Sequence, residues 1–512
     1  MATFADWRAA VDKELKGADF AKTLVAQTPE GIAIEPLYTE RGAEPGLPGA
    51  APFVRGSSAA PTPFRIIMRV SGEEDAAAHV EGGADGVWIE GGEPVIALSN
   101  GVELHLADPI SGLARGDASA LLWSEQLSKR GPLPSMGAVY MLRASTIPAH
   151  DAGADAADEI AYALSAGVAY LRTLTQLTAG AAARYLVMQV AIGRDTFGEI
   201  CKLRALRLCW HKILAAAGEP NASPPLIHAV CSSRTEAQRD PWVNLLRGTT
   251  QVFAAALGGA EWITPIPFDS ALGGDSAVAQ RAARNTALVL REESQLGRVI
   301  DPAGGSYYVE ARTESLARAA WERFSRMERA GGVVALIASG ALRARYGEEW
   351  AKRDAAIAKR REPVLGVSEF ANPEEQLPSP VPPPVEPPRG PALVPHRDGE
   401  RFEALRARTE GRDVALVTLG PPAEHRARVG FASNFFAAAG IRARETSELA
   451  AASVVCLCGS DDRYATDAAA AVAALRAAGA KRIVLAGRMA LDGVTNIYTG
   501  CDALAVLTEL LA

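Results

Sequence analysis

The chain has 512 residues, with 53 lysines and arginines against 60 aspartates and glutamates, so its formal net charge is −7. This length predicts two or three domains, and a hydrophobic content of 48% excludes global disorder. The mildly acidic charge lacks the basic footprint of a nucleic-acid binder, so we predict no nucleic-acid partner.

Two further classes are excluded by the distribution of residues. No apolar run approaches the length of a membrane span, and residues 1–20 mix acidic with basic side chains, which is typical of neither a signal nor a transit peptide. Six scattered cysteines without a CxxC pair indicate neither a disulfide framework nor a zinc or dithiol site. We therefore expect a reduced, cytoplasmic protein.

The first predicted element is an amphipathic helix near the N-terminus. Trp7, Val11 and Leu15 recur at four-residue spacing and share one helix face. The opposite face mixes both signs of charge, which favours packing on the chain's own core or on a partner over packing on a membrane. Residues 1–40 are accordingly assigned to an N-terminal helical arm.

Residues 41–365 alternate predicted strands with predicted helices. Apolar stretches at 86–89 and 185–192 are typical of strands, and segments 151–177 and 197–218 carry apolar residues at helical spacing. Such alternation over about 300 residues favours a (β/α)8 barrel of the TIM type. The fold class predicted for the chain is therefore α/β.

A proline-rich linker is predicted over residues 366–398. Ten of the 32 prolines lie between Pro373 and Pro395. Because proline fixes φ and lacks a backbone donor, this stretch can form neither a helix nor a central strand. We expect an extended, semi-rigid linker that wraps over a neighbouring domain or subunit.

A smaller α/β domain is predicted over residues 399–512. Apolar runs at 413–420, 453–459 and 481–487 are typical of buried strands, and they alternate with helical stretches that end at Gly440 and Gly479. Apolar strands that alternate with helices predict a parallel, doubly wound sheet.

Short motifs assign no chemistry to either domain. The GxSxG, GxxxxGK[ST], HExxH and GxGxxG patterns are all absent. The seven histidines occur as singles, and Cys456 and Cys458 share one face of an apolar strand, where a buried pair is favoured over a metal site. No catalytic, cofactor-binding or metal-binding residue is therefore assigned.

Longer strings carry a resemblance to a known family. Segments 151–174, 199–214, 240–269 and 283–324 closely resemble the methylmalonyl-CoA mutase family, in collinear order. The resemblance implies an acyl-CoA-binding (β/α)8 barrel followed by a flavodoxin-like cobalamin domain. Active members are isomerases of propionate metabolism, in which adenosylcobalamin starts the radical rearrangement of methylmalonyl-CoA to succinyl-CoA.

The cofactor motif of active members is altered in this chain. Their D-x-H-x-x-G sequence, in which the histidine ligates cobalt, corresponds to Ala423–Arg428. His425 is retained, but the acid that orients it is Ala423, and the glycine that lets the nucleotide tail pass is Arg428. We therefore expect His425 to be a surface residue and the domain to be degenerate. Two further family positions have also lost their pattern, at 458–460 and at 486–487.

The barrel is altered as well. A Tyr-His pair that contacts the substrate thioester in active members corresponds to Ile147-Pro148. The Tyr/Thr/Arg-rich segment that closes around substrate and CoA corresponds to residues 57–70, which contain no tyrosine. These losses imply the small, non-catalytic subunit of a heterodimeric enzyme. Adenosylcobalamin and the acyl-CoA would then be bound by a homologous catalytic large subunit and not by this chain.

The N-terminal arm fits the same interpretation. Its W-x-x-x-V-x-x-x-L-K-G-x-D-F pattern, over residues 7–20, resembles the arm of family subunits and is expected to pack across the partner. Larger side chains would fill the former substrate channel.

Two alternatives remain open: an active acyl-CoA mutase that uses His425, and a cofactor-delivery or regulatory protein of the mutase. The latter class is expected to carry a nucleotide-binding loop, which the sequence lacks. The choice between methylmalonyl-CoA and a related acyl-CoA is also open.

Overall fold

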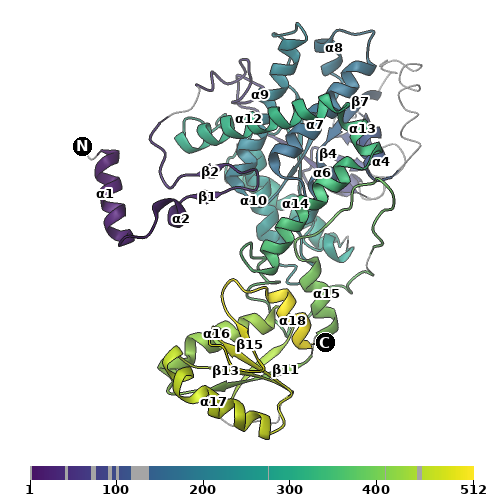
Figure 1. The fold of residues 1–512 in the computed structure, drawn as a ribbon. Helices are drawn as coiled ribbons and strands as arrows, with labels where there is room; N and C mark the ends of the chain where they lie inside the picture. The colour runs from purple at the N-terminus through teal and green to yellow at the C-terminus, as the bar shows by residue number, and fades with distance from the viewer. Residues whose placement is uncertain are drawn as a thin grey trace.

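The computed structural model describes residues 3–40, 44–70, 76–89, 95–99, 103–116, 138–274, 276–383, 385–409, 411–446 and 453–511. A closed eight-stranded barrel wrapped by helices is followed by a five-stranded sheet that lies near the C-terminus (Figure 1). The predicted α/β class is confirmed. Within these ranges no helix is long and apolar enough to cross a membrane. Two predicted domain limits lie outside the described residues: the start of the barrel domain at residue 41 and the end of the last domain at residue 512.

The barrel departs from a regular (β/α)8 order at one strand. Its strands follow one another in the closed order β10-β3-β4-β5-β6-β7-β8-β9, and β5 runs antiparallel to both of its neighbours. Parallel neighbours need a crossover of about a dozen residues or more, and the connections on either side of β5 are shorter. The closed barrel is present, but the predicted (β/α)8 order fails at β5. The strands are β3 (Arg65–Val70), β4 (Gly86–Ile89), β5 (Val95–Leu98), β6 (Glu103–Ala107), β7 (Ala138–Ser145), β8 (Leu186–Ile192), β9 (Leu226–Cys231) and β10 (Trp262–Thr264).

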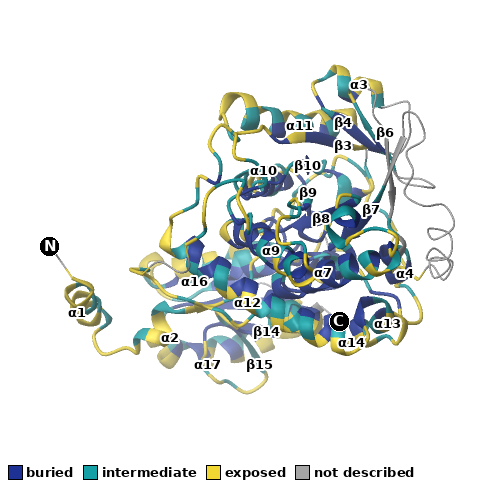
Figure 2. Cartoon of the chain, turned by 90° about the horizontal axis from the view of Figure 1, so that it is seen from above, coloured by how far each residue is buried: buried dark blue, intermediate teal, exposed yellow. Residues whose placement is uncertain are grey.

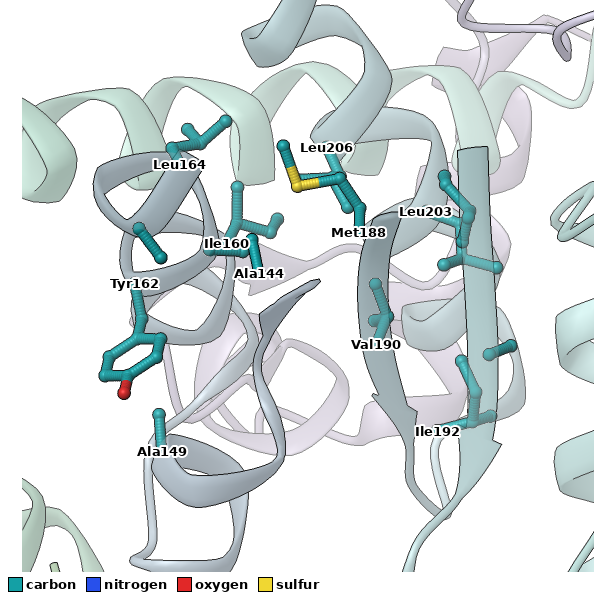
Figure 3. Close-up of a cluster of buried hydrophobic side chains, with 14 of the residues drawn as sticks. Ala144, Ala149, Ile160, Tyr162, Leu164, Met188, Val190, Ile192, Leu203 and Leu206 are labelled. Atoms are coloured by element: carbon teal, nitrogen blue, oxygen red, sulfur yellow. The ribbon is translucent and has the colours of Figure 1, made fainter. Parts of the chain in front are cut away.

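Helices cover the outside of the barrel and bury its main apolar cluster. Figure 3 shows part of this cluster, in which Ile160, Leu164 and Leu206 from the helices meet Met188 and Val190 of β8. Side chains of this cluster are almost all inaccessible, as the dark centre of Figure 2 shows. The longer helices are α7 (Ala156–Thr173), α9 (Thr196–Ala216), α10 (Val243–Leu257), α11 (Ala277–Leu288), α12 (Tyr307–Arg329) and α14 (Ala341–Ala358). The shorter ones are α3 (Ala76–Glu81), α4 (Pro109–Ala114), α6 (Ile147–Asp151), α8 (Ala179–Ala183) and α13 (Gly332–Ala338).

The helix predicted over 151–177 is present but begins later than expected. α6 ends at Asp151, and α7 begins only at Ala156. Gly153 between them has φ +104, and a Cβ there would lie 2.6 Å from the Cβ of Trp350. Asp155 then caps α7 by accepting a hydrogen bond from the Asp158 amide at 3.0 Å. A glycine forced into the left-handed region therefore delays the start of the predicted helix.

The C-terminal sheet is parallel throughout, in the order β12-β11-β13-β14-β15. This is one of the common doubly wound orders. The polar edge strands β12 and β15 were not predicted, because neither shows the apolar run that marks the three central strands. The strands are β11 (Asp413–Thr418), β12 (Arg442–Thr446), β13 (Val454–Cys458), β14 (Arg482–Ala486) and β15 (Val494–Ile497), and the helices are α15 (Glu400–Thr409), α16 (Pro422–Ala437), α17 (Asp461–Ala477) and α18 (Ala503–Leu511).

The proline-rich segment lies along the barrel. Arg343 of α14 donates hydrogen bonds of 2.9 Å to the carbonyls of Pro388, Gly390 and Ala392. The amide of Leu393 donates to Ala114 O at 2.8 Å, and its side chain joins the barrel's apolar cluster. The linker thus packs on helices α14 and α4 of the barrel domain before the chain enters α15.

Helix α1 (Phe4–Leu15) of the N-terminal arm stands away from the barrel (Figures 1 and 2), whereas Glu30, later in the arm, accepts a hydrogen bond from the Ala156 amide at 3.0 Å. The arm's helices α1 and α2 (Phe20–Leu24) contain no buried residue, and the hairpin β1 (Ala26–Gln27) and β2 (Ala33–Ile34) follows them. Trp7 packs edge-on against Phe20 at 6.2 Å between ring centroids. The apolar side of α1 is therefore only partly covered by its own chain, with Phe4 49% exposed and Trp7 half-buried.

Candidate functional site

The interior of the barrel is filled by large side chains. One apolar cluster joins Ile67, Trp88, Ile96, Val187, Val230 and Trp262, which come from six different barrel strands. The imidazole of His228 lies between two indoles, 5.6 Å from the Trp88 ring and 6.0 Å from the Trp262 ring. Both indoles and the imidazole are buried, at 6% exposure or less. Among the described residues, these aromatic side chains therefore fill the barrel interior at this level.

A chain of hydrogen bonds crosses this interior above the indoles. Ser145 Oγ donates to Gln189 Oε1 at 2.8 Å, and Gln189 Nε2 lies 3.3 Å from Nδ1 of His228. His228 Nε2 lies 2.8 Å from Thr264 Oγ1. Burial, with a contribution from Arg143, lowers the pKa of His228 to about 3. The imidazole is therefore neutral, and both of its nitrogens are used within the protein.

A second buried polar network lies at the carboxyl ends of β7, β8 and β9, the end at which barrel enzymes place their active sites. His150 of α6 has Nδ1 at 2.7 Å from Glu159 Oε1 and Nε2 at 2.6 Å from Ser232 Oγ. Burial, followed by Arg234 and Lys202, holds the pKa of His150 well below its usual value. A neutral imidazole thus donates to the carboxylate and accepts from the hydroxyl.

This arrangement has the connectivity of a serine–histidine–acid triad, but it is closed to substrate. His150 is 0% exposed, and Ser232 and Glu159 are each 2% exposed. Lys202 Nζ lies 2.8 Å from Glu159 and 2.6 Å from Glu199. Burial lowers the pKa of Lys202, but the two carboxylates outweigh it and raise that pKa above the usual value. The network therefore serves to pair buried charges.

Ile147 and Pro148, which replace the family's substrate-contacting Tyr-His pair, lie next to this network. Ile147 and Pro148 open α6, with Pro148 buried and Ile147 packed against the interior apolar cluster. The position of the family's Tyr-His pair is therefore apolar and enclosed. The contact between His150 and Ser232 was not predicted from the sequence, because 82 positions separate the two residues and no short motif contains both.

A cavity of about 360 Å³ opens at the opposite end of the barrel. Several residues of the segment predicted to be altered, among them Ser57 and Arg65, form part of its wall together with Glu261 and Trp262. Ser57 Oγ donates to the carboxylate of Glu261. Trp262 therefore belongs both to the wall of this cavity and to the interior cluster.

His425 is buried, so the expectation that it lies on the surface is wrong. It is 7% exposed in the first turns of α16, where its Nδ1 donates to Gly420 O at 3.1 Å. Its Nε2 lies 3.5 Å from Glu445 of the edge strand β12. The helix start folds the ring back over its own β11–α16 loop, and both nitrogens face groups of this chain.

The crevice at the carboxyl edge of the C-terminal sheet is bridged by side chains. Arg428 Nη1 donates to Ala486 O at 2.8 Å, and its Nη2 lies 3.0 Å from Asp461. Ala423 offers no acid to orient His425. These residues do not fit cobalamin. Among the described residues no group of three histidine, cysteine, aspartate or glutamate side chains could hold a metal ion.

Comparison with known proteins gives the class. Residues 134–415 match the methylmalonyl-CoA mutase family. The methylmalonyl-CoA mutase small subunit of Streptomyces virginiae is 37% identical over 602 aligned positions, covering 100% of this chain and 96% of the relative. The probable small subunit of Mycobacterium tuberculosis is 36% identical, covering 91% of this chain and 88% of its own length.

A relative named simply methylmalonyl-CoA mutase, from Cereibacter sphaeroides, is 30% identical over 71% of this chain and 64% of the relative. The fold and these matches define an α/β protein related to isomerases. The chain belongs to the methylmalonyl-CoA mutase family, and it is similar over its full length to members named small subunit.

Proposed function

We propose that this chain is the non-catalytic small subunit of a heterodimeric methylmalonyl-CoA mutase and that it stabilises the catalytic large subunit. Adenosylcobalamin and the acyl-CoA are held by that partner, which carries out the isomerisation of methylmalonyl-CoA to succinyl-CoA. The filled barrel axis is the observation that carries the proposal. A pantetheine-sized chain needs a continuous pocket, and Trp88, His228 and Trp262 occupy the corresponding space.

The assignment of regions follows from this role. Residues 1–40 form an arm that packs on the partner, residues 41–365 a TIM-type barrel, residues 366–398 a linker, and residues 399–512 a flavodoxin-like domain of degenerate cobalamin-binding type. The partly uncovered apolar side of α1 supports the first assignment, because an apolar helix face gains most when a partner covers it. An obligate interface of this kind typically buries more than about 2,000 Å². Six free, buried cysteines suit a cytoplasmic location.

The competing activity, a mutase that uses His425, lacks support in the contacts of that residue. A cobalt ligand needs a nitrogen directed toward the cofactor and a partner that orients the ring. In this chain Gly420 O orients the ring through Nδ1, but Nε2, the nitrogen left to ligate a metal, faces the carboxylate of Glu445 at 3.5 Å. A cofactor-delivery role has no supporting contact among the described residues.

Reconstitution tests the proposal. The large subunit is purified alone, with this chain, and with the His425→Ala variant of this chain, and turnover of methylmalonyl-CoA is measured together with bound cobalamin. We expect this chain to raise the thermal stability of the large subunit, and His425→Ala to leave turnover per cobalamin unchanged. The half-buried His211→Ala variant is the matched control. Loss of turnover with His425→Ala alone would favour the active-mutase alternative.

A further inference from the structure

Two strands of the C-terminal sheet end in glycine. Gly459 follows β13 and Gly487 follows β14. A Cβ on Gly459 would lie 3.2 Å from Cε1 of Tyr464, and a Cβ on Gly487 would lie 2.9 Å from its Cε2. The phenol ring therefore lies between the two strand ends, in a slot that the missing side chains leave open.

The hydroxyl of Tyr464 is fixed by backbone groups at the same edge. The amide of Gly459 donates to it at 2.8 Å, and the hydroxyl lies 3.1 Å from Leu457 O and 3.0 Å from Ala486 O. One hydroxyl proton serves one carbonyl at a time. Because Arg428 also donates to Ala486 O, the hydroxyl is free to donate to Leu457 O, and both carbonyls are satisfied.

Ion pairs close the slot from the side of α16. Glu424 of α16 lies 2.6 Å from Arg463 of α17, and Arg428 lies 3.0 Å from Asp461 at the start of α17. These helices follow β11 and β13, between which the strand order reverses. Doubly wound sheets hold their ligands in the crevice at that point. Two ion pairs therefore span the place where a ligand would enter.

We propose that the slot between Gly459 and Gly487 is a ligand cradle that the chain fills permanently with its own Tyr464 and Arg428. The phenol ring takes the place of a planar heterocycle, and the guanidinium takes the hydrogen-bonding role of its polar substituent at Ala486 O. The cradle deepens the proposed function, since it names the side chains that keep this domain free of a nucleotide-like ligand. The proposal of a cradle depends on the proposed function only in that cobalamin is chosen as one of the test ligands.

Chemical rescue tests the cradle in the full-length chain. In the double variant Tyr464→Ala/Arg428→Ala, the slot loses its ring and the cation that covers it. We expect the melting temperature to fall by several degrees and millimolar benzimidazole, a planar heterocycle, to restore part of the loss. Tyr464→Phe keeps the ring, so benzimidazole should leave this matched control and the wild type unchanged. A folded double variant that benzimidazole fails to stabilise overturns the proposal.

A second measurement needs no destabilised variant. The Gly459 amide donates to the Tyr464 hydroxyl, so its hydrogen exchange should be slow in the wild type and at least tenfold faster in Tyr464→Phe, while core amides of β13 keep their rates. Fast exchange in the wild type would mean that the slot opens, and the proposal would be wrong.

The outcomes also separate the two proposals. Failure of rescue, with normal reconstitution of the mutase, removes the cradle and leaves the proposed function intact. Stoichiometric binding of hydroxocobalamin by the wild-type chain contradicts both.

Discussion

Replacing Asp151 by asparagine should stabilise the protein at alkaline pH. Asp151 ends α6, and its Oδ1 has no accessible surface and no hydrogen-bond partner among the described residues. Burial raises the pKa of this carboxyl from 3.8 to about 6; Arg234 opposes the shift and Glu159 adds to it. The folded protein therefore holds the proton more tightly than the unfolded chain.

The magnitude follows from proton linkage. A rise of about two pKa units corresponds to about 3 kcal/mol of differential interaction between the two protonation states. Because the folded pKa is the higher one, this stability is present below pH 3.8 and is lost as the pH rises through about 6. Above that pH the buried, charged carboxylate opposes folding. Asparagine keeps the shape without the charge, so Asp151→Asn should raise the free energy of unfolding by up to about 3 kcal/mol at pH 8.

Urea unfolding at a series of pH values, followed by circular dichroism, measures this effect. The difference between Asp151→Asn and the wild type should be small near pH 4 and should grow through pH 6 to its full value near pH 8, given the shift in pKa. Asp492→Asn, in an exposed loop, is the matched control and should show no such slope. A variant that is less stable than the wild type at pH 8, or a difference independent of pH, would refute the reasoning.

Three further predictions concern the buried charges. Lys202→Met removes the cation between Glu159 and Glu199 and should lower the free energy of unfolding by about 3–5 kcal/mol. The control Lys212→Met, at an exposed position, should lower it far less. Urea titrations at neutral pH measure both changes. Neither carboxylate oxygen of Glu236 has a hydrogen-bond partner among the described residues, and burial raises its pKa well above the usual value. Glu236→Gln should therefore raise the melting temperature at pH 8 and have little effect at pH 4; a lower melting temperature at pH 8 would contradict this. Because the pKa of His150 is depressed by burial, the wild type should lose stability as the pH falls below 6.5, and His150→Gln should flatten this acid limb of the pH profile; an unchanged limb would contradict it.

The limits of prediction from the sequence can be seen in particular elements. The strands β8, β13 and β14 were predicted near their observed bounds because each is a continuous apolar run, and α9 because its apolar residues recur at helical spacing. The polar edge strand β12 was missed, because its pairing depends on β11 and not on an apolar pattern.

In the candidate sites, too, local features could be predicted from the sequence and tertiary contacts could not. The substitutions Ala423 and Arg428 were visible in the sequence, since they interrupt a short motif. The consequence of the second was not, because Arg428 bonds Ala486, which lies 58 positions later. The burial of His425 likewise depends on the fold of the β11–α16 loop and on the neighbouring strand β12. Local motifs therefore predict which residues are lost, and only tertiary packing shows what replaces them.

Cobalamin retention by the isolated chain tests the central claim most directly. The purified chain is incubated with adenosylcobalamin and passed over a sizing column, and visible absorbance is recorded in the protein peak. The bridged crevice and the Glu445 carboxylate in front of Nε2 of His425 predict no cobalamin in that peak, with binding and turnover appearing only after the large subunit is added. Stoichiometric cobalamin on the isolated chain would contradict the account and restore His425 as a cobalt ligand.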